Sequence, residues 1–265
     1  MEGVTENVVL TLMAHPDDAE FLCGGTLALL AQQGWNIHVA TATAGDCGSS
    51  TLRPEEIAAI RRQEARSSAS LLGGTFHCLE RRDLQVRYDA ETLVAACGLL
   101  RAVRPRLLIT HSPTDYMVDH EQISLVARAA AFNAPIPNAP APLGSRPLQA
   151  IPHLYYADPA EGKDGFGQVI SPGLLIDVST TLETKLAMLA CHASQRDWLR
   201  RHHGMDDYLD SARRWSRARG TLAGCDYAEG FRQHRGHAYP QDDLLALTLP
   251  GRAIPYPGET RDTGR

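Results

Sequence analysis

The apolar positions of the first 110 residues predict strands and helices in alternation. Short apolar runs of the length of buried strands occur at 8–13, 36–43, 75–79 and 107–110. Stretches typical of helices lie between them, at 26–31, 54–72 and 90–103. This order predicts a Rossmann-like, doubly wound α/β fold, in which a mostly parallel sheet carries helices on both faces within a single domain.

In the second half of the chain the spacing of apolar positions indicates helices and strands less clearly. Residues 133–152 hold six prolines and predict a long loop, which either walls a pocket or only connects two elements. We expect residues 1–265 to form one domain with a helical C-terminal part at 180–265. The individual elements expected are strands at 153–157 and 174–178 and helices at 121–132, 180–201 and 205–219.

Two clusters of His and Asp follow the first and the fourth predicted strand. The first holds His15, Asp17 and Asp18, and the second ends on Asp119-His120. In a doubly wound sheet these two strands are neighbours at the point where ligands bind. Taken alone, each cluster is explained by a carboxylate that caps the next helix. Taken together, they favour a metal site, because imidazole and carboxylate are zinc ligands and three of them leave a fourth position open.

The residues Ala14-His15-Pro16-Asp17-Asp18-Ala19-Glu20 and the second cluster resemble the LmbE/PIG-L family of zinc-dependent N-acetylglucosaminyl deacetylases, most strongly over residues 7–132. The resemblance implies that His15, Asp18 and His120 hold Zn²⁺ and that Asp17 is the general base. In one place the chain departs from the family. It has Met117 where many relatives carry a histidine that assists the oxyanion or the leaving amine, and a thioether cannot donate a proton.

Further residues near the two clusters are candidates for supporting roles. Candidates for stabilising the oxyanion or orienting a ligand are His111, Asp115 and Tyr116. Candidates for binding the substrate are Asp46, Arg61 and Asp83.

The resemblance implies a zinc-dependent hydrolase that removes an N-acyl group, with acetyl expected, from the 2-amino group of a glucosamine-containing small molecule or glycoconjugate. One alternative keeps the metal and makes the protein an amidase of a thiol conjugate. Another is a sugar-binding protein whose catalysis is impaired, as Met117 would indicate. The presence of Asp17 argues against that last hypothesis, because a binding module needs no base beside a metal.

The composition of the chain excludes several classes of binding partner. A net charge of −5 and a pI near 6.1 argue against nucleic acid or an anionic membrane. The six cysteines show no CxxC spacing, so they predict neither a disulfide framework nor a structural zinc site. No apolar run reaches the roughly 20 residues of a membrane span and the start is not basic, which predicts a cytoplasmic protein. Assembly into a homo-oligomer is left open.

Overall fold

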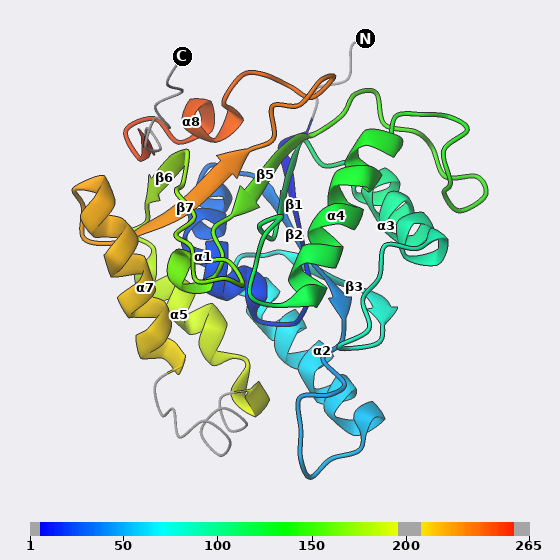
Figure 1. The fold of residues 1–265 in the computed structure, drawn as a ribbon, viewed down its shortest axis with the longest axis horizontal. Coiled ribbons are helices and arrows are strands. Elements are labelled where there is room, and N and C mark those ends of the chain that lie inside the picture. The colour runs from blue at the N-terminus through cyan, green and yellow to red at the C-terminus, as the bar shows by residue number, and fades with distance from the viewer. Residues whose placement is uncertain (1–5, 196–207, 257–265) are drawn as a thin grey trace.

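The computed structural model describes residues 6–195 and 208–256, which form an α/β fold around one sheet of eight strands (Figure 1). Strands β1 to β5 run parallel, and β7 joins them antiparallel. The sheet order is β3-β2-β1-β4-β5-β7-β6-β8. The strands are β1 (Val8–Met13), β2 (Asn36–Thr43), β3 (Thr75–Arg81), β4 (Leu107–Thr110), β5 (His153–Ala157), β6 (Leu174–Asp177), β7 (Ala228–Gln233) and β8 (Ala253–Pro255).

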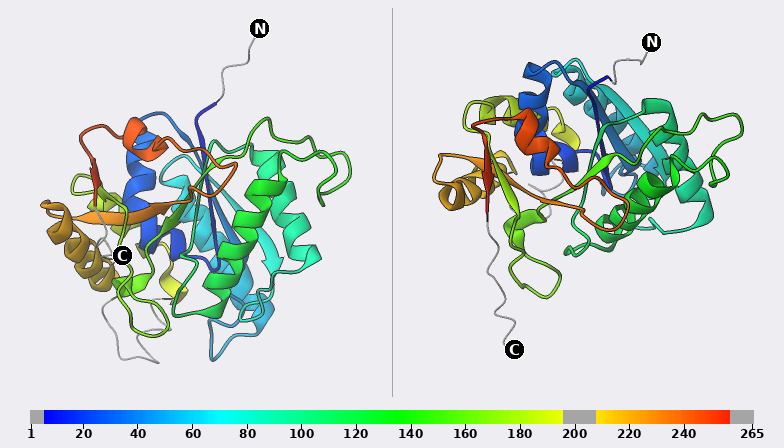
Figure 2. Two further views of the ribbon diagram at one scale, coloured as in Figure 1. Left: turned by 45° about the horizontal axis from the view of Figure 1, so that its top comes forward. Right: turned by 90° about the horizontal axis from the view of Figure 1, so that it is seen from above.

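Helices cover both faces of this sheet, which confirms the predicted fold class (Figure 2). Helices α3 and α4 pack on one face, and α1, α2 and α8 pack on the other. Helix α5 packs against α1, and α7 packs against β7, β6 and α5. The helices are α1 (Asp18–Gln32), α2 (Pro54–Ser70), α3 (Ala90–Val103), α4 (Val118–Asn133), α5 (Leu182–Ala190), α7 (Tyr208–Ala223) and α8 (Leu244–Thr248), with a short 3₁₀ helix, η1, at Ala160–Gly162.

Strand β1 shows why the first apolar run has no polar alternation. Val9 and Met13 point into the core beneath α1, whereas Leu10 and Leu12 point into the core beneath α3 and α4. All four side chains are fully buried. A parallel strand covered on both faces is buried at every position, so its sequence is a nearly continuous hydrophobic run, in which Thr11 is the one polar residue.

Strand β4 lies directly beside β1, as the sequence predicted, and the two run parallel. Leu12 pairs with Thr110, whose hydroxyl donates a hydrogen bond of 2.7 Å to the Leu12 carbonyl. Both strands therefore end at the same edge of the sheet. The segments that follow them, leading into α1 and α4, are held side by side.

Two helices begin earlier than the sequence predicts. Helix α1 begins at Asp18 instead of residue 26 and is interrupted at Cys23, where φ is −143° and ψ is 15°. Helix α4 begins at Val118 instead of residue 121. Asp18 and His120 therefore lie in first helical turns, where free N–H groups and the helix dipole favour carboxylates. The poor helix propensity of Gly24-Gly25 concealed the start of α1.

The C-terminal part is not wholly helical, and in this respect the prediction is wrong. Strand β7 inserts between β5 and β6, and β8 forms the edge beside β6. The β7 segment contains Gly230 and charged residues, so its sequence does not have the pattern of a strand. The helix predicted at 180–201 ends as α5 at Ala190, and residues 196–207 lie outside the described residues.

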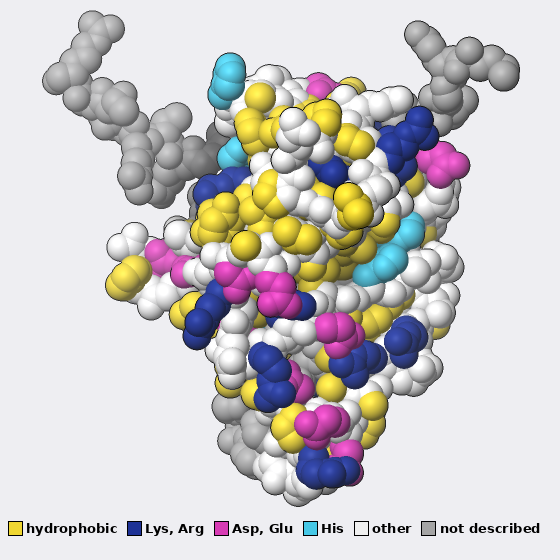
Figure 3. All heavy atoms as spheres, turned by 90° about the vertical axis from the view of Figure 1, so that its right-hand side faces the viewer, with side chains coloured by type: hydrophobic (Ala, Val, Ile, Leu, Met, Phe, Trp, Pro, Cys, Tyr) yellow, Lys and Arg dark blue, Asp and Glu magenta, His cyan; other side chains and the backbone are white. Residues whose placement is uncertain are grey.

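The proline-rich segment predicted as a loop at 133–152 forms no helix or strand after Asn133, which is the last residue of α4. It packs beside α3, where the Arg101 guanidinium donates hydrogen bonds of 3.1 and 2.6 Å to the carbonyls of Ala134 and Ile136. Figure 3 shows the corresponding face of the molecule, with apolar side chains gathered in its upper half and charges of both signs interspersed below. Among the described residues, no helix has the length and apolar character needed to cross a membrane.

Candidate metal site and substrate cavity

His15 follows β1, and its two ring nitrogens face different partners. Nδ1 lies 3.4 Å from Oδ2 of Asp18. Nε2 lies 3.0 Å from Oδ1 of Asp83 and 3.4 Å from Oδ2 of Asp119. Burial alone would lower the pKa of His15, but the carboxylates of Asp119, Asp18 and Asp83 raise it well above its usual value. A hydrogen on Nε2 held by two carboxylates leaves Nδ1 as the nitrogen available to a metal.

His120, in the first turn of α4, is oriented in the same way. Its Nδ1 lies 2.9 Å from Oδ1 of Asp115, and its Nε2 lies 3.6 Å from Oδ1 of Asp18. Asp115 therefore occupies the position expected of a carboxylate that orients a ligand, and Nε2 is directed at the same carboxylate as Nδ1 of His15. Metal-binding histidines usually donate their second N–H to a carboxylate in this manner.

His15, Asp18 and His120 offer ligand atoms that all lie within 4.8 Å of one another. Two imidazoles and one carboxylate make a donor set that suits zinc and leaves room for a further ligand. A second grouping joins His15 to Asp83 and Asp119. There, however, Asp119 already accepts backbone N–H groups of Leu84 and Val86, at 2.8 and 3.3 Å. The first grouping is the better fit for a single divalent ion.

His111 supports this grouping from behind. It is fully buried, its ring stacks on that of His120 with centroids 3.9 Å apart, and its Nε2 lies 3.1 Å from Oδ2 of Asp18. Burial and the proximity of His120 lower the pKa of His111. His111 is not among the residues that line the cavity described below. Its contacts match the other predicted role, which is to orient a ligand.

Asp17 precedes α1 in a left-handed conformation, with φ at 99°. Non-glycine residues adopt this conformation at a cost, and such strain is concentrated at functional sites. Burial raises the pKa of Asp17, while the Arg61 guanidinium, 3.7 Å away, partly offsets this effect. Arg61 also donates a 2.7 Å hydrogen bond to the Pro16 carbonyl, and the Tyr208 hydroxyl hydrogen-bonds to Asp17. The carboxylate is thus held at a defined place beside Asp18.

A cavity of about 620 Å³ opens above these groups, which is within the range of small-ligand sites. Asp46 does not line it, but accepts the backbone N–H of Asp83 at 2.8 Å and so supports the Asp83 loop. Tyr116 stands at the rim, 63% exposed, with its ring edge-on to His120. The predicted site residues that line the cavity are His15, Asp17, Asp18, Arg61, Asp83, Tyr116 and His120.

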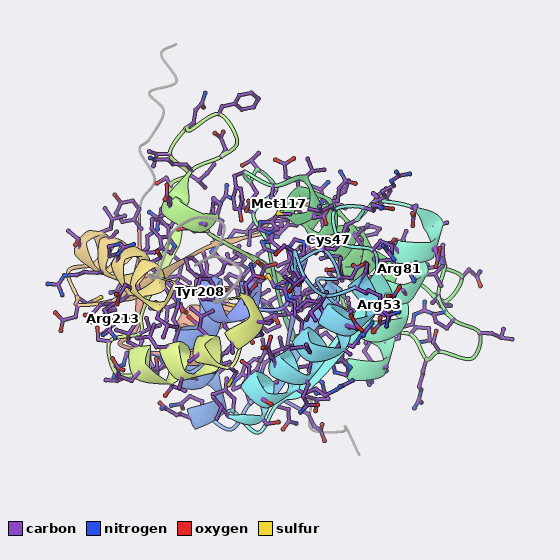
Figure 4. All side chains as sticks on the ribbon, turned by 90° about the horizontal axis from the view of Figure 1, so that it is seen from below. Cys47, Arg53, Arg81, Met117, Tyr208 and Arg213 are labelled. Atoms are coloured by element: carbon purple, nitrogen blue, oxygen red, sulfur yellow. The ribbon has the colours of Figure 1, made fainter. Side chains whose placement is uncertain are left out.

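Other walls of the cavity come from segments without a recognisable motif. Helix α7 contributes Tyr208, Arg214 and Trp215, and Met117 and Cys47 lie on the walls formed by the α4 and β2 loops (Figure 4). Only the fold brings α7 to the site, because nothing in its sequence distinguishes it from a solvated amphipathic helix. No residue of segment 133–152 lines this cavity, so of the two interpretations of that loop the connector is the one supported.

Comparisons with known proteins agree with this geometry. Residues 10–131 match the family described as PIG-L, GlcNAc-PI de-N-acetylase. The chain is 27% identical to a 4-oxalmesaconate hydratase of Pseudomonas putida over 197 residues, which cover 70% of this chain and 73% of that protein. It is 26% identical to a diacetylchitobiose deacetylase of Thermococcus kodakarensis over 238 residues, which cover 84% and 82% of the two chains.

Solved structures show the same likeness. The N,N'-diacetylchitobiose deacetylase of Pyrococcus horikoshii superposes with a TM-score of 0.74 at 26% identity, covering 90% of this chain and 88% of that one. The segment that matches the family model contains both charged clusters. Residues 10–131 therefore match the PIG-L (LmbE-like) family, as the two charged motifs predicted.

Proposed function

We propose that this protein is a zinc-dependent N-deacetylase that hydrolyses the acetamide of a glucosamine-containing small molecule or glycoconjugate. The observation that carries the proposal is the convergence of His15, Asp18 and His120 beside the buried carboxylate of Asp17, on the floor of a ligand-sized cavity. The Thermococcus and Pyrococcus relatives, both named for the deacetylation of diacetylchitobiose, support an acetylated amino sugar as the substrate.

Zinc held by His15, Asp18 and His120 would supply a Lewis acid that polarises an amide carbonyl and lowers the pKa of water to about 7. Asp17 accepts the proton of the attacking water and then delivers it to the nitrogen as the C–N bond breaks, releasing acetate and a free amine. Burial favours this role, because it raises the pKa of Asp17 and makes the carboxylate a stronger base. Arg61 keeps the carboxylate in place.

Met117 is the reason that we assign both proton transfers to Asp17. It lines the cavity just before α4, at the position where the family resemblance of the sequence implies a histidine. An amine is a poor leaving group unless it is protonated, and a thioether has no proton to give. We infer that Asp17 serves both as base and as acid in this chain.

The other substrate contacts that we propose are Asp83 and Arg61, since both line the cavity. The Cys47 N–H donates a hydrogen bond of 3.2 Å to Oδ2 of Asp83. The backbone N–H of Asp83 in turn donates a hydrogen bond to Oδ1 of Asp46, so that Asp83 is fixed at both its side chain and its backbone. Asp46 therefore acts through Asp83 rather than on the substrate. A carboxylate held in this way can accept hydrogen bonds from the hydroxyl groups of a sugar.

A hydratase is the second candidate, and two observations favour it. The Pseudomonas relative is named as a hydratase and matches most of this chain. The addition of water to a carbon–carbon double bond expels no amine. Asp17 would take the proton of the attacking water and return it to the other carbon, so hydration needs no separate proton donor at Met117. The two candidates differ in their products.

The experiment that tests the proposal compares these products. Zinc-loaded protein is incubated with N-acetylglucosamine, with diacetylchitobiose and, separately, with 4-oxalmesaconate. We expect free amine to appear with at least one acetylated sugar, because the site is arranged for amide hydrolysis. Loss of the double-bond absorbance of 4-oxalmesaconate without any amine release from the sugars would instead establish the hydratase. Protein treated with a chelator is the control in both assays.

The Asp17→Asn variant should bind as much zinc as the parent but turn over about 10²–10⁴-fold more slowly, because the amide keeps the shape of the side chain and cannot accept the proton. Metal content and kcat are measured on the same preparation. Loss of zinc from this variant would show that Asp17 is a ligand and not the base.

The Met117→His variant should have a kcat at least about tenfold higher on the acetylated substrate, because it provides a separate acid for the leaving amine. Met117→Gln is the matched control, since glutamine is polar but does not transfer a proton, and it should bring no gain. Equal rates for Met117→His and the parent would mean that another side chain already protonates the amine.

A further inference from the structure

The interruption of α1 at Cys23 leaves a second helical segment that begins inside the protein. The turn from Asp18 to Leu22 carries the metal-site carboxylate, and the helix resumes at Gly24-Gly25. The first N–H groups of any helix lack partners within the helix and need acceptors from elsewhere. Here these groups are buried, so water cannot supply the acceptor.

The side chain of Glu229, from β7, supplies that acceptor. Its Oε1 accepts the N–H of Gly25 at 2.9 Å, and its Oε2 accepts the N–H of Thr26 at 2.7 Å and the Thr26 hydroxyl at 2.6 Å. The carboxylate thus caps the resumed helix from a strand 204 residues away in sequence. A negative charge at a helix N-terminus is also favoured by the helix dipole.

Lys185, from α5, neutralises this carboxylate. Its Nζ lies 2.6 Å from Oε1 of Glu229, and the two side chains are 1% and 2% exposed. A buried carboxylate without a counter-charge would be strongly unfavourable. Lys185, Glu229 and the start of the resumed helix therefore form one charge-balanced unit.

The glycines at the interruption allow this close approach. A Cβ on Gly24 would lie 3.2 Å from Cγ of Lys185, and one on Gly25 would lie 2.7 Å from Cβ of Val178. The Thr181 hydroxyl donates a further hydrogen bond of 2.9 Å to the Gly25 carbonyl. The segment just after the metal-site turn is thus anchored on its C-terminal side to α5 and β7.

The turn itself is anchored on its other side by Glu20, the last residue of the first motif. Glu20 accepts the Ser68 hydroxyl at 2.6 Å and lies 3.1 Å from Nε2 of His192, and all three residues are buried. The five residues from Asp18 to Leu22 therefore have little freedom to shift relative to β1.

We propose that the Lys185–Glu229 pair is a positioning device for the metal site: by capping the resumed half of α1 it fixes the interruption at Cys23, which directs Asp17 and Asp18 toward His120. Neither residue lines the cavity, so both act through α1. This inference rests on the proposed zinc site. It assigns a role to a strand that the sequence pattern did not indicate.

The test is the double variant Lys185→Met, Glu229→Gln, with zinc affinity measured by competition with a chelator. Methionine fills the volume of the lysine stem, and glutamine retains one acceptor for the helix N–H groups, so no unpaired charge is buried. We expect zinc to bind about 10–100-fold more weakly, as when groups that orient metal ligands are removed. The visible spectrum of the cobalt-loaded protein should change as well, because the position of Asp18 changes.

The matched control is Asp158→Asn, Arg219→Met, which removes another buried ion pair, 2.7 Å long, that joins the end of β5 to α7 rather than to α1. It should lower the melting temperature but leave the zinc affinity within about twofold. Thr26→Val removes only the hydroxyl hydrogen bond to Glu229 and should also weaken zinc binding, though less than the double variant does. It replaces the double variant in the test if that protein does not fold.

The outcomes separate this inference from the proposed site. If the parent binds zinc and the Lys185/Glu229 and Thr26 variants bind it equally well, the pair contributes only to stability and the inference is wrong. If the parent binds no zinc, the proposed site fails, and the inference fails with it. Weaker binding in the Asp158/Arg219 control to the same degree would also overturn it, because any lost ion pair would then have the effect.

Discussion

The parallel pairing of β1 with β4 is the constraint on which the site depends. The register that pairs Leu12 with Thr110 ends both strands at one edge of the sheet, so His15 and His120 meet although they lie about a hundred positions apart in sequence. The order of the strands reverses at this point of a doubly wound sheet, so the two loops leave the sheet in opposite directions and a space opens between them. Ligands bind in this space in many α/β proteins. A shift of register would separate the two imidazoles.

Carboxylates then determine what each imidazole can do. Asp115 holds Nδ1 of His120, while Asp83 and Asp119 hold Nε2 of His15, so the remaining nitrogens both face Asp18. These interactions are buried, and water therefore competes little with them. The same burial raises the pKa of the neighbouring Asp17, which suits it to accept a proton. The proposed metal ligands and the proposed base thus lie together at one edge of the sheet.

The parts that the sequence predicted are those with local or short-period signals. Apolar runs gave β1 to β5, and the two charged clusters gave His15, Asp18 and His120 because their residue types carry the chemistry themselves. Strand β7 was missed because Gly230 and its charged neighbours lack the pattern of a strand. Its place between β5 and β6 is determined by tertiary contacts, which a single sequence does not reveal. Tyr208 and Trp215 reach the cavity only through the docking of α7, which no single-sequence pattern encodes. The contact of Asp46 could not be read from the sequence either, because Asp46 accepts the backbone N–H of Asp83, which lies beyond the next strand of the chain.

The central claim is that one imidazole from each loop and one carboxylate share a single zinc ion. The most direct measurement is the zinc content of purified parent protein beside that of His120→Ala and of His38→Ala, a histidine on β2 that pairs with His77 away from the cavity. The account predicts about one zinc per chain in the parent and in His38→Ala, and none retained after dialysis in His120→Ala. Full zinc retention by His120→Ala would contradict it.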